Sequence, residues 1–381
     1  MRFQVNRDVF SEAVSFVVKL LPQRNPQPIL AGVLVEAGPA GLTLSAFDYE
    51  ASARTTIECD VQETGTVLVH GRLLSEIASR LPQAAVEMQS DADGIRLRCG
   101  SARFTLAAMP VAEYPAIPEV GGTTGVVSGE SFATAIAQVA FAASRDDVTP
   151  VLTGVQLEAS GDTLTLLATD RYRVALRELE WTPADARAEA TTALVPARTL
   201  QEVGKTFAHG ESIAISFTGT GDRELVAFSS GDRTVTSLLI KGNFPPVRRL
   251  FPEQTDHFAV VATSELIEAV RRVSLVLDRA APLRFTFSAD GVGMEASGSE
   301  QARASETVDA ALTGGDVTLG LNPQYLLEAL GAVRSDYTRI TFTSSENANK
   351  LSPILVTAQT AADAPDSGAF RYLLQPNLLL R

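Results

Sequence analysis

Two kinds of hydrophobic pattern alternate along the chain, and each predicts a different structural element. Apolar residues spaced three or four positions apart predict six helices, which with their flanks cover residues 7–24, 71–80, 130–145, 198–205, 265–279 and 324–339. Strict alternation of apolar and polar residues predicts half-buried strands, most clearly at Ile95–Cys99, Arg103–Leu106 and Ile213–Phe217. Turn residues separate successive strands at Asp93-Gly94, Gly161-Asp162 and Asp290-Gly291. These patterns together predict an α+β fold.

The same blocks return at a fixed spacing, which indicates internal repeats. The block PILAGV from Pro28 recurs 122 positions later as PVLTGV from Pro150, and LTLSAFD from Leu42 recurs at the same spacing as LTLLATD from Leu164. A fainter third copy opens with LIEAV from Leu266. One repeat is therefore about 127 residues long, a third of the 381. Each repeat contains two helices, each with its own strands, so the chain predicts six helix-plus-sheet half-units.

Proline and glycine clusters without helical period mark the boundaries between the repeats. One runs from Tyr114 through Gly125 and the other from Phe244 through Pro252. The predicted domains are 1–122, 126–250 and 257–381. Within the third domain, Pro323 is placed for the first turn of a helix and Asn322 for its N-cap.

Composition narrows the class of protein further. The net charge of −13 makes the surface as a whole repel nucleic acid, so any contact with DNA must be local or topological. No apolar run is long enough to span a bilayer, and no secretory signal is recognisable at the N-terminus. Two cysteines, Cys59 and Cys99, are too few for a disulfide framework or a four-ligand zinc site. We therefore expect a cytoplasmic protein without membrane contact.

The residues do not favour catalysis. His70, His209 and His257 lie in different domains or linker regions, and the phosphate-loop-like run at Gly204-Lys205-Thr206 lacks the first glycine of that motif. Asp170-Arg171, directly after a strand, fits a tight turn with a surface ion pair. We expect no catalytic residue, no metal and no cofactor, while a repeat-built enzyme or ligand-binding protein stays open as an alternative.

Charge is distributed unevenly between the predicted helices and the rest of the chain. The helices with their flanks hold 13 bases and 10 acids, although the chain as a whole is acidic. Each helix contributes at least one base, which suits a surface that touches phosphates weakly. The bases expected to face DNA are Arg24, Arg72, Arg80, Arg145, Arg198, Lys205, Arg271 and Arg272.

Several blocks, taken in order, resemble the bacterial sliding clamp, the beta subunit of DNA polymerase III. They are QPILAGV from Gln27, GRLLSEI from Gly71, RFTL from Arg103, ATDRYRVA from Ala168, FP at Phe244 with RRLFP from Arg248, and NPQYL from Asn322. The resemblance covers essentially the whole chain. It implies three repeated DNA-clamp domains whose helices line the inside of a ring.

Size decides how many chains such a ring needs. A domain of this length has a radius of gyration of about 14 Å and hence a diameter of roughly 35 Å. Three touching spheres of that size leave a hole of only about 5 Å, whereas six leave about 35 Å, which admits a duplex roughly 20 Å wide. We therefore expect a homodimer that encircles double-stranded DNA without sequence preference.

The resemblance also implies an interface and a partner site. The dimer interface would use Phe104, Leu275 and Val276. Short peptides of the polymerase alpha subunit, the clamp loader and other clamp-binding-motif proteins would enter a groove between the second and third domains. Its expected lining is Leu152, Thr169, Arg171, Tyr172, Arg173, Val174, Pro245, Val247, Arg249, Leu250, Asn322, Tyr325, Leu374, Gln375, Pro376, Asn377 and Leu378.

The C-terminus departs from the family pattern. Gln375 and Asn377 place amides where clamps of this family carry soft apolar side chains, and Leu378 stands at the usual arginine position. Drift at a frayed terminus explains this as simply as any function. The alternative is a variant or second clamp that serves replication yet rejects a groove-binding peptide antibiotic, and so confers self-resistance.

Overall fold

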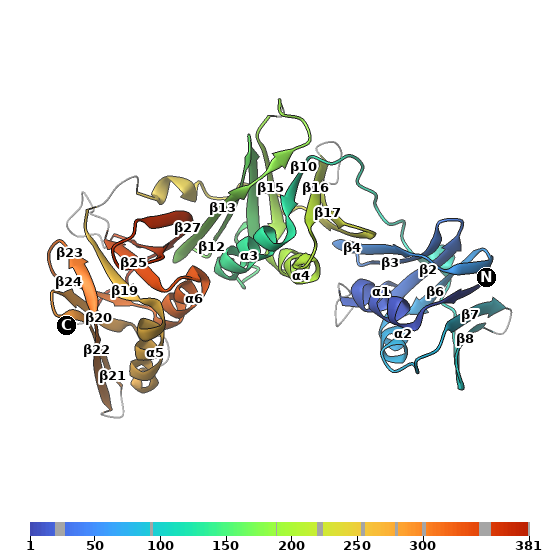
Figure 1. The fold of residues 1–381 in the computed structure, drawn as a ribbon, viewed down its shortest axis with the longest axis horizontal. Helices are drawn as coiled ribbons and strands as arrows, with labels where there is room; N and C mark the ends of the chain where they lie inside the picture. Colours follow the sequence, from blue (N-terminus) through green and yellow to red (C-terminus); the bar gives the residue numbers. More distant parts are fainter. Residues whose placement is uncertain are drawn as a thin grey trace. The chain divides into compact units, whose positions relative to one another are not determined.

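The computed structural model describes residues 1–19, 27–91, 94–187, 189–218, 224–252, 256–278, 281–298, 302–342 and 352–379. These residues form two compact units. The first comprises residues 1–133, 181–189 and 198–239, and the second comprises residues 134–180, 190–197 and 240–381. Helices and strands are labelled in Figure 1.

The first unit contains a five-stranded and a nine-stranded antiparallel sheet. The five-stranded sheet has the order β5-β1-β7-β8-β9 and the nine-stranded sheet the order β14-β10-β16-β17-β18-β4-β3-β2-β6. The bounds are β1 Arg2–Val5, β2 Gly32–Gly38, β3 Gly41–Phe47, β4 Ala51–Ile57, β5 Asp60–Glu63, β6 Gly65–His70, β7 Val86–Asp91, β8 Gly94–Cys99, β9 Ala102–Leu106, β10 Gly125–Ser128, β14 Thr182–Pro183, β16 Ser212–Thr218, β17 Leu225–Ser230 and β18 Arg233–Leu238.

The second unit contains a nine-stranded and a four-stranded sheet. The nine-stranded sheet has the order β15-β11-β12-β13-β27-β26-β25-β19-β23 and the four-stranded sheet the order β22-β21-β20-β24. The bounds are β11 Gly154–Ser160, β12 Thr163–Thr169, β13 Arg173–Glu180, β15 Thr191–Pro196, β19 Phe258–Ala262, β20 Leu283–Ser288, β21 Gly291–Ser297, β22 Arg303–Val308, β23 Ala310–Thr313, β24 Val317–Leu321, β25 Tyr337–Phe342, β26 Ile354–Gln359 and β27 Asp366–Leu374.

The strand orders confirm the six predicted half-units. The half-sheet β6-β2-β3-β4 recurs as β15-β11-β12-β13 and as β24-β20-β21-β22, and β5-β1-β7-β8-β9 recurs as β14-β10-β16-β17-β18 and as β23-β19-β25-β26-β27. Two pairings merge neighbouring half-sheets, β18 with β4 and β13 with β27. As a result, the two half-sheets of the central repeat belong to different units. The half-sheet β14-β10-β16-β17-β18 belongs to the first unit, and the half-sheet β15-β11-β12-β13 belongs to the second.

Six α-helices accompany the described strands: α1 Arg7–Lys19, α2 Gly71–Ala78, α3 Gly129–Val139, α4 Ala197–Phe207, α5 Thr263–Val273 and α6 Pro323–Val333. Their starts follow local chemistry. The Asn322 side chain accepts hydrogen bonds from the backbone N–H groups of Gln324 and Tyr325, with Pro323 in the first turn, which confirms the predicted cap of α6. The helix α2 is capped by His70, whose Nδ1 accepts from the Leu73 N–H at 3.4 Å.

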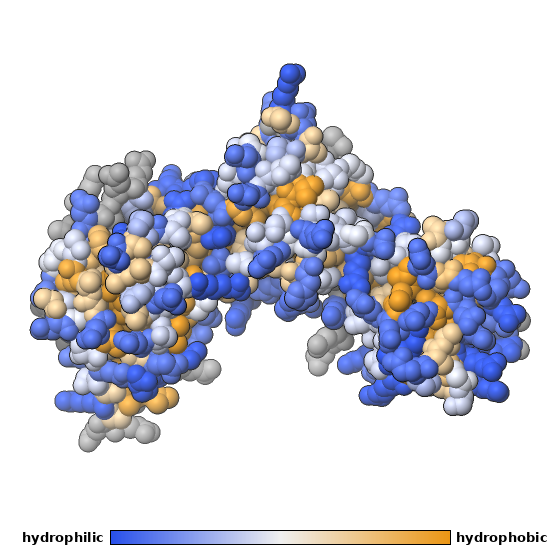
Figure 2. All heavy atoms as spheres, viewed as in Figure 1, coloured by the Kyte–Doolittle hydropathy of each residue, from blue (hydrophilic) through white to orange (hydrophobic). Residues whose placement is uncertain are grey.

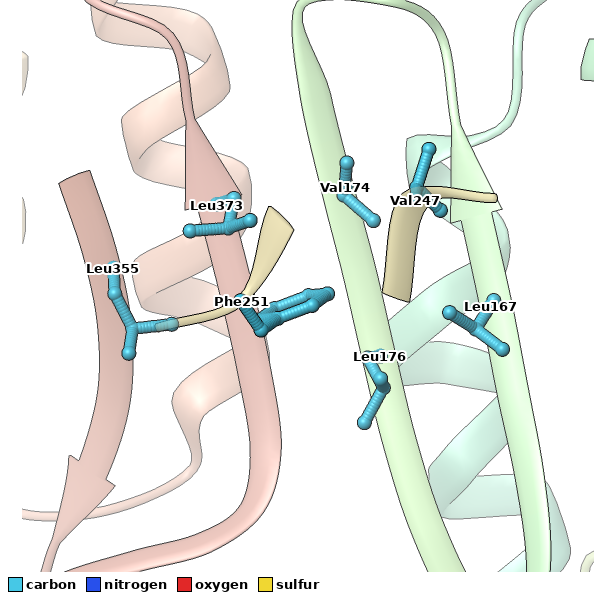
Figure 3. Close-up of a cluster of buried hydrophobic side chains, with 7 residues drawn as sticks. All are labelled: Leu167, Val174, Leu176, Val247, Phe251, Leu355 and Leu373. Atoms are coloured by element: carbon cyan, nitrogen blue, oxygen red, sulfur yellow. The ribbon is translucent and has the colours of Figure 1, made fainter. Parts of the chain in front are cut away.

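Hydrophobic packing seals the junction between β13 and β27. Side chains from β12, β13, β26 and β27 meet two residues of the linker between the second and third repeats, as Figure 3 shows. The cluster consists of Leu167, Val174, Leu176, Val247, Phe251, Leu355 and Leu373. Because the linker supplies Val247 and Phe251, this stretch is an ordered part of the core.

Candidate partner-binding site

The turn between β12 and β13 is shaped by an aspartate and a threonine. Asp170 Oδ1 accepts hydrogen bonds from the backbone N–H groups of Tyr172 (3.1 Å) and Arg173 (3.2 Å). Thr169 Oγ1 accepts from the Arg171 N–H (3.2 Å) and donates to the Arg173 carbonyl (2.7 Å). These bonds turn Arg171 and Tyr172 outward, and 61% of Tyr172 is exposed. The tight turn was predicted, but the aspartate pairs with Arg173 rather than with Arg171.

Arg173 points inward and ties the turn to α6. Its Nε donates to Asp170 (2.9 Å), its Nη1 pairs with Glu328, and its Nη2 donates to the Phe141 carbonyl (2.9 Å). Its guanidinium also lies over the Tyr325 ring, 4.3 Å from the ring centre. Only 6% of the residue is exposed, so its charge is compensated by these groups rather than by water.

Tyr372 completes the support beneath this arginine. Its hydroxyl donates to the carbonyl of Tyr325 (3.1 Å), and its ring stacks on Phe141. Burial raises the pKa of Tyr372 well above its usual range, so this hydroxyl stays protonated as a donor. The start of α6 is therefore fixed to β27 as well as to β13.

An open cavity of about 460 Å³ lies above these residues. Its lining mixes apolar and charged groups: Ala143, Ser144, Arg145, Asp146, Val148, Thr149, Leu152, Asp170, Arg171, Tyr172, Arg173, Gln324, Tyr325 and Glu328. Leu152 is buried at its wall, the rings of Tyr172 and Tyr325 lie 6.3 Å apart, and Val148 is 83% exposed. Exposed apolar groups beside a few fixed polar ones suit a short, partly apolar peptide. We call this cavity the tyrosine pocket.

Chain comparison identifies the family to which this site belongs. Residues 1–118, 126–246 and 248–363 match the N-terminal, central and C-terminal domains of the DNA polymerase III beta subunit. The chain belongs to this family, the bacterial sliding clamps.

Individual relatives agree over the whole length. The chain is 44% identical to the beta sliding clamp of Streptomyces coelicolor over 99% of both chains, and 38% identical to the beta sliding clamp homolog GriR of Streptomyces muensis, also over 99% of both. A Pseudomonas aeruginosa sliding clamp solved bound to griselimycin superposes with a TM-score of 0.89, at 25% identity and full coverage of both chains.

The predicted groove residues fall into three groups in this clamp. The tyrosine pocket includes Leu152, Arg171, Tyr172, Arg173 and Tyr325. A second cavity of about 360 Å³, beside the linker, includes Pro245, Val247 and Arg249. The others line neither: Thr169 shapes the turn, Asn322 caps α6, Val174 and Leu374 are buried among the strands, and Leu250 is 52% exposed.

The C-terminal tail is held by backbone pairing beyond β27. The Gln375 N–H donates to the Tyr172 carbonyl (2.9 Å), and the Asn377 N–H donates to the Gly320 carbonyl of β24 (2.8 Å). Pro376 is buried between these two bonds, whereas Leu378 is 78% exposed. Residues 374–378 are not among the lining residues of either cavity, although the bond from Gln375 reaches Tyr172 at the edge of the tyrosine pocket.

Sequence reasoning missed the loop that forms one wall of the tyrosine pocket. Residues 143–146, 148 and 149 line it, yet Arg145 was expected to face DNA and the others had no assigned role. One signal was available, since Val148 stands as a lone apolar residue within the polar run SRDDVT from Ser144. Its 83% exposure shows that it is not a core residue.

The residues expected to face DNA are all exposed where the structure describes them, and Arg24 lies outside the described residues. Four pair with nearby acids: Arg72 with Glu76 (3.8 Å), Lys205 with Glu202 (2.8 Å), Arg271 with Glu268 (2.7 Å) and Arg272 with Glu306 (2.5 Å). Arg80, Arg145 and Arg198 form no ion pair with any described residue. Arg80 and Arg145 follow α2 and the 3₁₀ helix Ala140–Ala142 rather than lying on a helix.

One of the expected interface residues lies in an edge strand, and the other two lie in a short helix. Phe104 is in β9, the edge strand of the five-stranded sheet, and is 36% exposed. Leu275 and Val276 lie in the 3₁₀ helix Ser274–Val276 that follows α5, and Leu275 is 84% exposed. Hydrophilic residues cover most of the surface visible in Figure 2. Large exposed side chains such as Leu275 are therefore exceptions to the general surface.

In the described part of the chain, no group of three or more His, Cys, Asp or Glu residues is arranged to hold a metal ion. Within the same residues, no helix has both the length and the apolar character needed to cross a membrane.

Proposed function

We propose that two copies of this clamp close head to tail into a ring around duplex DNA, and that the ring acts without catalysis by holding DNA polymerase on its template. The observation that carries this proposal is the count of strands in the sheets. Two junctions within the chain join a four-stranded and a five-stranded half-sheet into nine strands, while β9 and β22 are left as edges. In a dimer, β9 of each copy would pair with β22 of the other copy. Each of these two pairings would again join a five-stranded and a four-stranded half-sheet into nine strands.

Internal symmetry supplies a register for that pairing. At the β18–β4 junction Val235 lies opposite Ala53, and at the β27–β13 junction Tyr372 lies opposite Ala175. All four residues are buried. We counted paired residues from the hairpin that precedes each strand. On this count Phe104 is third in β9, as Val235 is in β18, and Ala304 is second in β22, as Ala53 is in β4. We therefore expect Phe104 to lie opposite Ala304 of the partner subunit. At this junction, as at the two within the chain, a large side chain would lie opposite an alanine.

Retention on DNA tests the ring directly. A closed clamp should stay on circular DNA after loading and run off linear DNA, because topology rather than affinity keeps it bound. Equal loss from both forms would contradict the proposal. The weak, salt-screened attraction of a few exposed bases then suffices for sliding.

The interface has its own test. Replacing Phe104 and Val276 with aspartate should give monomers of 40.4 kDa in sedimentation experiments, whereas the wild type should sediment as a dimer of twice that mass. Charges placed on Val9 and Tyr49, which are exposed to a similar degree on other elements, serve as the matched control. A dimer that survives the Phe104 and Val276 changes would exclude this interface.

The tyrosine pocket is the proposed docking site for the polymerase alpha subunit, the clamp loader and other proteins with a clamp-binding motif. Support comes from its exposed rings, its buried Leu152 and its fixed polar groups. A labelled peptide of the Gln-x-x-Leu-Phe type should bind the full-length clamp. Tyr172→Ala should weaken that binding, whereas Leu250→Ala, which removes an exposed side chain outside both cavities, should not.

A second candidate function is self-resistance to a groove-binding peptide antibiotic. Support comes from the amides of Gln375 and Asn377, from the relative named GriR and from the Pseudomonas clamp that binds griselimycin. The higher identity to the Streptomyces coelicolor clamp favours the replicative role. Gln375→Met with Asn377→Val should tighten griselimycin about tenfold, and the polymerase peptide less, if these amides disfavour the inhibitor. Equal shifts for both ligands would indicate drift, and no shift would place the two residues outside the binding site.

A further inference from the structure

The hydroxyl of Tyr372 makes a contact that is not repeated at the other junction within the chain. It donates to the backbone carbonyl of Tyr325 (3.1 Å), one of the two aromatic residues of the tyrosine pocket. Tyr372 lies opposite Ala175 where β27 pairs with β13, and the equivalent place at the β18–β4 junction belongs to Val235, opposite Ala53. Because valine cannot donate a hydrogen bond, only the junction beside the tyrosine pocket has this contact.

A neighbouring backbone bond, by contrast, is common to both junctions. The Gln375 N–H donates to the Tyr172 carbonyl (2.9 Å). At the other junction the Leu238 N–H donates to the Glu50 carbonyl (2.8 Å). Each donor lies three positions beyond the residue compared above, and each acceptor lies two positions after the aspartate of its turn. This bond belongs to the repeated turn, so it does not explain what distinguishes the two junctions.

The two junctions differ in the space beside the turn. At the first, the cavity holds only about 10 Å³ and is closed by side chains that include Pro118 and Leu238, so these side chains restrain one another by contact. At the second, the cavity is open and about 460 Å³ in volume. The Tyr325 ring there has the Arg173 guanidinium 4.3 Å from its centre and the Tyr172 ring at 6.3 Å. An open pocket has less packing to hold this ring, and the bond to the Tyr325 backbone supplies a restraint in its place.

We propose that Tyr372 is a positioning residue for partner binding, whose hydroxyl holds the start of α6, and with it the Tyr325 ring, in the place that a bound peptide requires. Tyr372 is fully buried and is not among the lining residues of the pocket, so it acts without touching the peptide. A ring that is already ordered loses less conformational entropy when a peptide binds, which raises the affinity. This inference rests on the proposed docking role of the pocket and adds a residue beneath it that sets its affinity.

The test measures binding of the peptide acetyl-Gln-Ala-Ala-Leu-Phe to the full-length clamp by calorimetry. Tyr372→Phe keeps the ring that stacks on Phe141 and removes only the hydroxyl. It should weaken binding about fivefold, the effect of one lost hydrogen bond. Tyr114→Phe is the matched control, because the Tyr114 hydroxyl also donates to a backbone carbonyl, that of Gly32 (3.2 Å), but lies in the first unit. The control should leave the affinity unchanged.

A second measurement separates positioning from a general loss of stability. If Tyr372 acts through Tyr325, Tyr372→Phe should weaken binding by less than about twofold in the Tyr325→Ala background, because the ring that the hydroxyl positions is gone. A general loss of stability would instead weaken binding by the same factor in both backgrounds. Thermal unfolding of Tyr372→Phe and Tyr114→Phe sets a temperature at which both variants are folded.

Each outcome separates this inference from the proposed docking site. Wild-type affinity in Tyr372→Phe, equal weakening by Tyr114→Phe, or the same factor in both backgrounds would overturn the role of Tyr372 while peptide binding itself stands. Failure of the wild-type clamp to bind the peptide would overturn both the docking site and the positioning role.

Discussion

The carboxylate of Glu328 on α6 pairs with the guanidinium of Arg173 on β13, 155 positions earlier in the chain. Removing it would leave a cation that is only 6% exposed with Asp170 as its remaining acidic partner. We expect Glu328→Ala to lower the free energy of unfolding by about 2 kcal/mol, less than the loss of a whole buried pair because Asp170 remains. Chemical denaturation measures the change.

The control for this prediction is an exposed pair. Glu306→Ala breaks the ion pair with Arg272, in which both side chains are accessible to water. That change should be close to neutral. Equal effects of the two substitutions would contradict the structural role of Glu328.

Repeated blocks in the sequence located the elements well because their spacing reflects packing within each half-unit. Gly32 and Gly154, the glycines of the first matched block, occupy equivalent tight sites. A Cβ on Gly32 would lie 2.6 Å from Leu68, and one on Gly154 would lie 2.8 Å from Leu194. The match aligned these two glycines. It could not reveal the leucines, because β6 and β15 approach only after the sheet has formed.

The candidate site was less predictable because its members come from separate strands, helices and loops. The prediction that Asp170 lies in a tight turn is correct. Its ion pair with Arg173 was not predictable, because it forms only when the Arg173 side chain points into the core. The placement of Gln375 and Asn377 depends on hydrogen bonds to Tyr172 and Gly320, which no local pattern encodes. Counting charges on each helix likewise missed Glu306, an acid on β22 that pairs with Arg272 of α5.

Tyr114 in the first linker makes stability depend on pH at the alkaline end. Its hydroxyl accepts from the Phe47 N–H (2.8 Å) and donates to the Gly32 carbonyl (3.2 Å), and burial raises the pKa of Tyr114 to about 12. An unfolded tyrosine ionises near pH 10, so folding favours the neutral form. The stabilisation is complete below pH 10 and is lost as the pH rises from 10 to 12.

Tyr114→Phe isolates this effect. The substitution should cost about 1 to 3 kcal/mol at neutral pH, because two buried backbone groups lose their partner. The gap between wild type and variant should narrow between pH 10 and 12. A gap that stays constant up to pH 12 would show that Tyr114 ionises as freely in the folded protein as in the unfolded chain.

Phe251 tests whether the second linker belongs to the core. It is 9% exposed and packs with Val174, Leu176 and Leu373, whereas its neighbour Leu250 is 52% exposed. Phe251→Ala should lower the free energy of unfolding by about 3 to 5 kcal/mol, and Leu250→Ala by less than about 0.5 kcal/mol. Urea titration of both variants measures the difference, and a small effect of Phe251→Ala would mean that the linker packs loosely.

The exposed arginines of the helices should contribute unequally to DNA binding, because some are already neutralised by a neighbour. Arg198 on α4 has no ion pair within the described residues, whereas Arg271 on α5 pairs with Glu268 at 2.7 Å. Arg198→Ala should lower the slope of log affinity against log salt by about 0.9, the value for one phosphate contact, and should do so for every duplex sequence. Arg271→Ala should change the slope less, since Glu268 must be displaced before a phosphate can bind.

Glu268→Gln provides the matched control, because freeing Arg271 should steepen the slope. Arg271→Ala in that background should then match the loss seen with Arg198→Ala. Fluorescence anisotropy on short linear duplexes of two unrelated sequences measures these slopes. Losses that depend on the sequence, or no change in any variant, would show that these helices do not face DNA.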